Sequence, residues 1–240
     1  MHSSLATPLS TEAFFSTVLG LRPPIAVFDC DGTLWGEDTG YEFMLWSIAE
    51  GIVSRGASDW IDSRYRLYRA GKVSEIGICG EMVQLYEGVR ETEIRHAAAV
   101  FFRTRVLASI FPEMLRLVDE LRTGGANVWA VSSTNNWVIE EGLRGFNIPA
   151  DRILATRVEV VEGTVTSKLI DVPSDEGKAL ALNKAGISAP AIVFGNSIHD
   201  AAMLEIAQNP FAVNPTQQLQ ALAAKRGWPV FFPTENHHLG

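Results

Sequence analysis

The chain has 240 residues, of which 47% are hydrophobic and 20% are charged, and its formal net charge is −8. That length suits one large domain, or a core domain with a smaller insert, and the apolar content suffices for a buried core. The acidic balance argues against a generic nucleic-acid-binding protein. Two cysteines, Cys30 and Cys79, are too few for a disulfide scaffold or a structural zinc site.

The N-terminal segment, residues 1–22, is expected to be an extension with one short helix over Ser10–Leu19. It has no basic region and Glu12 interrupts its apolar stretch, so a secretory signal is not expected. No run approaches the roughly 18 apolar residues of a membrane span, which predicts a cytoplasmic protein without membrane partners. Residues up to Ser10 and from Thr234 onward are expected to be loose ends.

Short, continuous apolar runs recur along the chain and predict strands buried on both faces, as in a parallel sheet. Helical spacing separates the runs, for example at Met114–Leu121, which indicates a doubly wound α/β core. The predicted strands are Ile25–Phe28, Val128–Val131, Ala191–Phe194, Phe211–Val213 and Pro229–Phe232.

Residues 39–109 contain no convincing strand run, and apolar residues there recur at helical spacing in four places. The pattern predicts an α/β core formed by residues 23–38 and 110–240. An all-helical domain of residues 39–109 is then inserted after the first strand.

Two acids, Asp29 and Asp31, end the apolar strand Ile25–Phe28. Residues i and i+2 of a strand share a face, so these side chains project together and Cys30 points away. The carboxyl end of a strand is where open α/β sheets bind ligands. Like charges so close favour a bound cation or a raised pKa on one acid, and such a pair can serve as nucleophile and acid/base.

The string Asp29–Leu34 after an apolar strand resembles the first motif of the haloacid dehalogenase (HAD) superfamily. Ser132, Lys178 and Gly195–Asp200 resemble the second, third and fourth motifs in the same order, so the resemblance covers about residues 25–232. It implies a Rossmann-like HAD core. The inserted helices resemble the C1 cap of the phosphoserine-phosphatase-like branch.

The resemblance implies a role for each matching residue. Asp29 would be the nucleophile and form an aspartyl-phosphate, while Asp31 would act as general acid and then as general base. The residues implied to bind phosphate are Ser132, Ser133, Lys178 and Thr33. Mg²⁺ would be held by Asp29, Asp31 through its backbone carbonyl, Asn196 and Asp200.

Asn196 departs from the family pattern, which usually has an acid at this position. An amide oxygen can bind Mg²⁺ but adds no charge, so weaker metal binding or a larger role for Asp200 is expected. The second acid, Asp31, is absent from the superfamily's dehalogenases, and its presence favours phosphate ester hydrolysis.

The resemblance also bears on the substrate. Met82 stands where the branch carries a carboxylate-binding arginine, and Asp38 falls near its amine-binding glutamate. Glu37, Asp38 and Asn135 are candidate substrate residues, which suits an amine-bearing substrate such as a phosphorylated amino alcohol. His199 is expected to be a surface or packing residue.

The leading prediction is a Mg²⁺-dependent phosphomonoesterase for a small phosphorylated metabolite, with no nucleic-acid partner and an open oligomeric state. A covering cap would exclude bulk water and large substrates. Two alternatives remain. One is a phosphotransferase that uses an acceptor other than water. The other, suggested by Asn196, is a catalytically weak phosphate-ligand binding or regulatory protein.

Overall fold

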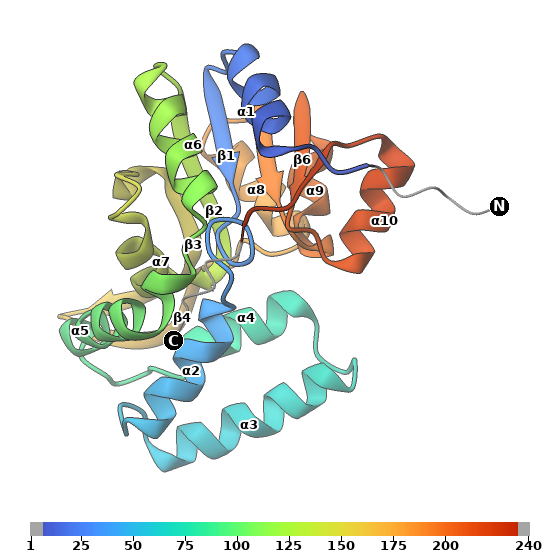
Figure 1. Ribbon diagram of the computed structural model, residues 1–240. Coiled ribbons are helices and arrows are strands. Elements are labelled where there is room, and N and C mark those ends of the chain that lie inside the picture. Colours follow the sequence, from blue (N-terminus) through green and yellow to red (C-terminus); the bar gives the residue numbers. More distant parts are fainter. Residues whose placement is uncertain (1–6, 235–240) are drawn as a thin grey trace.

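A seven-stranded sheet forms the centre of the computed structural model, which describes residues 7–234 (Figure 1). The strand order is β4-β3-β2-β1-β5-β6-β7. Neighbouring strands are parallel except β3 and β4, which pair antiparallel at one edge. This mostly parallel sheet, flanked by helices, confirms the predicted α/β core.

The strands are β1 (Ile25–Phe28), β2 (Asn127–Asn135), β3 (Ile153–Val161), β4 (Thr164–Asp171), β5 (Ile192–Gly195), β6 (Asn209–Val213) and β7 (Val230–Phe231). The α-helices are α1 (Thr11–Gly20), α2 (Thr39–Ala49), α3 (Arg55–Arg69), α4 (Glu75–Gln84), α5 (Glu91–Phe101), α6 (Pro112–Thr123), α7 (Asn136–Leu143), α8 (Glu176–Lys184), α9 (Ala201–Glu205) and α10 (Gln217–Arg226). A π-helical turn, η1 (Phe102–Val106), continues α5, and short 3₁₀ turns lie at η2 (Leu107–Ser109), η3 (Ala150–Arg152) and η4 (Ile198–Asp200).

Each face of the sheet has its own apolar core. Phe28 and Phe194 lie on one face, with side chains of α1, α6 and α7. Val27 and Val193 lie on the other, with side chains of α8, α9 and α10. Both faces of the central strands are buried, so these strands have continuous apolar sequences. The apolar runs therefore predicted them correctly.

Helix α1 belongs to this core. Phe14 is fully buried, and its ring stacks on Phe231 with the ring centroids 4.0 Å apart. Just before the helix, the Leu9 amide donates to the Val230 carbonyl at 2.8 Å, and Ser10 Oγ accepts from the Ala13 amide. The predicted helix is confirmed, but the expectation of a loose end is wrong for Leu9 and Ser10. Residues 1–6 and 235–240, which were also expected to be loose ends, lie outside the described residues.

Strands β3 and β4 are missing from the sequence-based prediction, which relied on continuous apolar runs. They form the edge of the sheet, and polar residues such as Arg157, Glu159 and Lys168 interrupt their apolar residues. A strand with one exposed face needs such residues, so it carries a weaker apolar signal.

Helices α2, α3, α4 and α5 lie between β1 and α6 in the chain, and α2, α3 and α4 lie beneath the sheet in Figure 1. Helix α4 packs against β2, β3 and β4. At its end, Gln84 Nε2 donates to the Ser167 carbonyl at 2.6 Å. The carboxyl ends of the central strands thus face the inserted helices. Within residues 7–234, no helix combines the length and apolar character needed to cross a membrane.

Candidate active site

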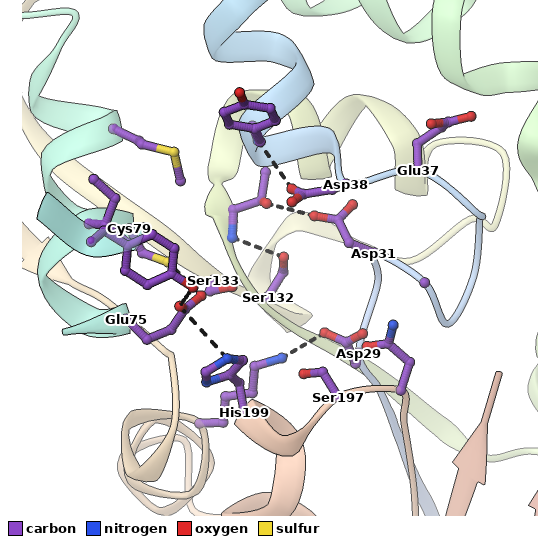
Figure 2. A pocket seen from close by; sticks show the side chains of 18 of the residues that line it. Asp29, Asp31, Glu37, Asp38, Glu75, Cys79, Ser132, Ser133, Ser197 and His199 are labelled. Atoms are coloured by element: carbon purple, nitrogen blue, oxygen red, sulfur yellow. Dashed lines mark hydrogen bonds and ion pairs between the residues drawn. The ribbon is translucent and has the colours of Figure 1, made fainter. Parts of the chain in front are cut away.

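Asp29 follows β1 directly and is buried at the carboxyl end of that strand. Figure 2 shows Asp29 at the base of the site. Its Oδ1 accepts from Lys178 Nζ at 2.6 Å, and its Oδ2 accepts from the Thr33 hydroxyl at 2.8 Å. Burial and the charge of Asp200 raise the pKa of Asp29 to about 7, although Lys178 acts in the opposite direction. A further cation beside Asp29 would therefore favour its charged form.

Lys178 lies in the first turn of α8 and is almost fully buried. Its Nζ also lies 2.5 Å from Asp200 Oδ1. Burial alone would lower the pKa of Lys178, but the charges of Asp200 and Asp29 outweigh it and raise this pKa above its ordinary value. Lys178 is thus a fixed cation between two carboxylates.

Asp200 has both carboxylate oxygens engaged. Oδ1 binds Lys178, and Oδ2 accepts from the backbone amides of Asn196 and Ser197, each at 2.9 Å. The side chain is fully buried and does not line the cavity described below. This geometry favours a positioning role, in which Asp200 holds Lys178 and the turn after β5, over the predicted role as a direct metal ligand.

Asp31 lies two residues beyond Asp29 and borders the cavity. Its Oδ1 accepts from Trp35 Nε1 at 2.7 Å and from the Thr39 hydroxyl at 2.6 Å. Its Oδ2 accepts from the Thr134 hydroxyl at 2.7 Å, as Figure 2 shows. Three neutral donors, from the loop after β1, the start of α2 and the end of β2, therefore fix the orientation of this carboxylate.

Asn196 follows β5 and lies against the turn after Asp31. Gly32 has a φ of +73°, which favours glycine, and a Cβ there would lie 1.8 Å from Asn196 Nδ2. Asn196 and Asp29 line the same cavity. The predicted convergence of the first and fourth sequence motifs is therefore found in the structure.

The end of β2 supplies the second motif. Ser132 and Ser133 line the cavity, as expected of phosphate-binding residues. Asn135 does not line it, because its Oδ1 accepts from the Val138 amide at 3.0 Å and caps α7. Thr33 does not line the cavity either, because its hydroxyl donates to Asp29 Oδ2. Asn135 thus caps α7 and Thr33 supports Asp29, and their contacts with substrate and phosphate stay predictions.

A cavity of about 310 Å³ opens above these residues, towards α2, α3 and α4. Glu37 and Asp38 both line it, as predicted, but Figure 2 shows the Glu37 side chain directed away from Asp38. Asp38 Oδ1 accepts from the Tyr41 amide at 3.1 Å and caps α2. Desolvation, together with the like charges of Asp31 and Glu75, raises the pKa of Asp38 to about 6.

Several cavity residues are absent from the sequence-based prediction. His199, expected to be a surface or packing residue, is partly exposed and lines the cavity, with Nδ1 2.7 Å from Asp175 Oδ1 and Nε2 3.7 Å from Glu75 Oε2. Glu75 begins α4, and its only local signal is the serine cap before it. The other unpredicted lining residues include Tyr65, Tyr68, Ile78, Cys79, Thr134 and Ser197.

Comparison with known sequences identifies relatives of this arrangement. The family model described as haloacid dehalogenase-like hydrolase matches residues 26–205. A histidinol-phosphatase from Neisseria meningitidis is 25% identical, over 86% of this chain and 97% of that protein. A phosphoserine phosphatase from Mycobacterium tuberculosis is 24% identical, over 95% of this chain and 78% of that protein.

Solved structures share the fold. A protein of unknown function from Bordetella pertussis superposes with a TM-score of 0.75 at 24% identity, over 86% of this chain and 97% of that one. A phosphoserine phosphatase with an analogue of its phospho-aspartyl intermediate gives a TM-score of 0.59 at 17% identity, over 89% of this chain and 94% of that one.

Proposed function

This chain belongs to the family of haloacid dehalogenase-like hydrolases, and we propose that it is a Mg²⁺-dependent phosphomonoesterase for a small phosphorylated metabolite. The observation that carries the proposal is the buried Asp29, bonded to Lys178 and open to a cavity that Asp31 also borders. Relatives named as phosphatases support the reaction class. A cavity of about 310 Å³ suits a small substrate.

The reaction would proceed in two steps. A carboxylate oxygen of Asp29 attacks phosphorus, and the bond to the ester oxygen breaks as Asp31 donates a proton to the leaving alcohol. Asp31 then takes a proton from water, whose oxygen attacks the aspartyl-phosphate and releases inorganic phosphate with Asp29 regenerated. Lys178, Ser132 and Ser133 would stabilise the phosphoryl oxygens.

The donor set around Asp29 fits Mg²⁺, a hard cation that takes oxygen ligands and keeps waters. The residues that would hold it are Asp29, Asp31 through its backbone carbonyl, and Asn196 through its amide oxygen. Within residues 7–234, no cluster of three or more His, Cys, Asp or Glu side chains forms a metal site, so the set would combine one carboxylate, Asp29, with two neutral oxygens. When bound, Mg²⁺ would offset the phosphate charge so that an anionic nucleophile can approach.

The proposal includes a cap over the active site, formed by the helices of residues 39–109. They supply the wall of the cavity opposite Asp29, including Tyr65 and Glu75. Such a cover would keep bulk water from the aspartyl-phosphate.

The test is release of phosphate from 4-nitrophenyl phosphate, with Mg²⁺ or with EDTA. We expect metal-dependent turnover that falls at least about 10³-fold in Asp29→Asn. Release of 4-nitrophenol that outpaces free phosphate when alcohols are added would instead indicate transfer to another acceptor. Ligand-dependent thermal stabilisation without turnover would contradict the proposal and favour a binding protein.

A second variant, Asn196→Asp, tests the metal site. It adds a charged oxygen donor beside Asp29, so half-maximal activity is expected at a Mg²⁺ concentration about 10-fold lower. An unchanged or higher requirement would remove Asn196 from the proposed ligand set.

A further inference from the structure

The two carboxylate oxygens of Asp31 have different surroundings. Oδ1 accepts from Trp35 Nε1 at 2.7 Å and from the Thr39 hydroxyl at 2.6 Å, while Oδ2 accepts from the Thr134 hydroxyl at 2.7 Å. Each carboxylate oxygen has about two lone-pair positions for hydrogen bonds. In the described part of the chain, the donors therefore fill both positions on Oδ1 and leave one open on Oδ2.

The two donors to Oδ1 are buried away from the cavity. Trp35 and Thr39 have no exposed surface, and neither residue lines the cavity. Thr134, which donates to Oδ2, does line it. The partners of Asp31 thus direct Oδ1 towards the interior of the protein and leave Oδ2 on the side where a phosphate ester would bind.

Trp35 is a rigidly held donor. Its ring meets Phe102 edge-on with the ring centroids 5.3 Å apart, and a Cβ at Gly142 would lie 2.9 Å from its Cη2 atom. The Trp35 carbonyl also accepts from the Gly32 amide at 2.8 Å, which closes the turn after Asp31. Because the indole is packed on these sides, its N–H cannot follow a carboxylate that rotates, and it therefore fixes the direction of Oδ1.

Thr39 and Thr134 belong to separate parts of the fold and meet at Asp31. Thr39 is the first residue of α2, and Thr134 lies near the end of β2. The next residue of α2, Gly40, packs so closely on Thr134 that a Cβ there would lie 2.6 Å from the Thr134 Oγ1 atom. The start of α2 is thereby held against the sheet, which fixes one hydroxyl at each oxygen of the carboxylate.

The chemistry of the donors separates the two oxygens further. An indole N–H donates and cannot accept, so it occupies a lone pair of Oδ1 in both protonation states of Asp31. A proton on the other lone pair of Oδ1 would point at the buried Thr39 and not into the cavity. A threonine hydroxyl can donate or accept, so Thr134 remains a suitable partner when Oδ2 carries a proton.

Building on the proposed phosphatase function, we propose that Asp31 exchanges its proton through Oδ2, and that Trp35 and Thr39 are positioning residues that hold Oδ1 away from the reaction. When the ester oxygen leaves phosphorus, it takes the proton from Oδ2, and the electron pair of that O–H bond stays on Oδ2. In the second step Oδ2 takes a proton from water, while the water oxygen bonds to phosphorus and the bond from phosphorus to Asp29 breaks.

The experiment measures kcat/KM for two esters whose leaving groups differ in their need for a proton. The 4-nitrophenolate group leaves readily as an anion, whereas the ethoxide group of ethyl phosphate needs protonation. Trp35→Phe removes the indole donor, and Thr39→Val removes the hydroxyl at nearly constant shape. In each variant, kcat/KM should fall about 10-fold for ethyl phosphate and less than about 3-fold for 4-nitrophenyl phosphate. Thr39→Ser keeps the hydroxyl and should restore the rate with ethyl phosphate.

Trp137→Phe is the matched control for loss of an indole donor. Trp137 is also buried, and its Nε1 donates to a carboxylate oxygen, Glu91 Oε1, at 3.2 Å. Neither residue lines the cavity, so this variant should leave the ratio of kcat/KM for the two esters unchanged.

The outcomes are distinguishable. An equal fall for both esters in Trp35→Phe and Thr39→Val would indicate a general structural role and overturn the positioning role. An unchanged or higher kcat/KM for ethyl phosphate would assign the proton transfer to Oδ1 and also overturn the inference. If Trp35→Phe does not fold, Thr39→Val and Thr39→Ser decide between these outcomes. Absence of turnover of both esters by the unaltered protein would overturn the proposed function itself.

Discussion

The two ends of the cavity handle charge in opposite ways. At the reaction end, Asp29 and Asp200 share Lys178 at 2.6 and 2.5 Å, and all three side chains are almost fully buried. At the far end, Asp38 and Glu75 have no lysine or arginine partner among the described residues. They are bonded by a backbone amide and by the hydroxyl of Tyr68.

This difference separates acids that share a buried lysine from acids that have no lysine or arginine partner among the described residues. Removing one member of a buried, paired set leaves an uncompensated charge in the interior, which is strongly unfavourable. Removing the charge of an acid that has no lysine or arginine partner, while keeping its hydrogen-bond acceptor, relieves repulsion and should not weaken the fold. Stability measurements on variants at both ends of the cavity test this difference.

The largest effect is expected for Lys178→Met. Asp29 and Asp200 would then face each other without a counter-charge, and we expect a loss of about 3–5 kcal/mol in the free energy of unfolding. Urea denaturation measures it. Lys184→Met is the control on the same helix: Lys184 is 68% exposed and lies 3.4 Å from Asp171, so its removal should cost less than about 1 kcal/mol. Equal losses in both variants would contradict the comparison.

An intermediate effect is expected for Thr134→Val, which removes one of the three hydrogen bonds to Asp31. A misoriented acid slows departure of a poor leaving group most. The kcat for alkyl phosphates should fall about 10-fold, with a smaller fall for 4-nitrophenyl phosphate. Thr134→Ser keeps the hydroxyl and should restore the rate. Equal losses for both kinds of ester would indicate a general structural role.

The smallest effect is expected for Asp38→Asn. The pKa of Asp38 is raised from 3.8 to about 6, so between these values the folded metal-free protein binds more protons than the unfolded chain. Its contribution to stability is therefore lost as pH rises from about 4 to 6. Asp38→Asn should remove this part of the decline and gain less than about 1 kcal/mol at pH 7, since Asp38 is exposed. Thermal unfolding at pH 4.5 and pH 7 would measure it, and a steeper decline in the variant would refute the assignment.

The reaction end could be predicted from sequence because each of its parts is a local pattern. Asp29 and Asp31 end an apolar strand and Asn196 follows another predicted strand, while Lys178 was identified by its resemblance to a sequence motif. Parallel strands bring such ends together, so the sheet itself implies their convergence. Asp200 shows the limit of this reasoning, because its orientation depends on two backbone amides that no pattern reveals.

The far end could not be predicted in the same way. Tyr65, Tyr68 and Glu75 lie on two helices, and their convergence depends on how α3 and α4 pack. Helical spacing shows which face of each helix is apolar, but not which residues meet across it. The hairpin of β3 and β4, against which α4 packs, was itself missed.

The borders of the sheet have a consequence for self-association. An open strand edge offers unpaired amides and carbonyls to a second molecule. Strand β7 has only two residues, and the amide of Leu9 already occupies the carbonyl of Val230. At the opposite border, β4 presents Lys168 and Asp171, and charged side chains discourage another strand from docking. Both borders therefore carry protection against edge-to-edge aggregation, and at β7 it comes from the few residues that precede α1.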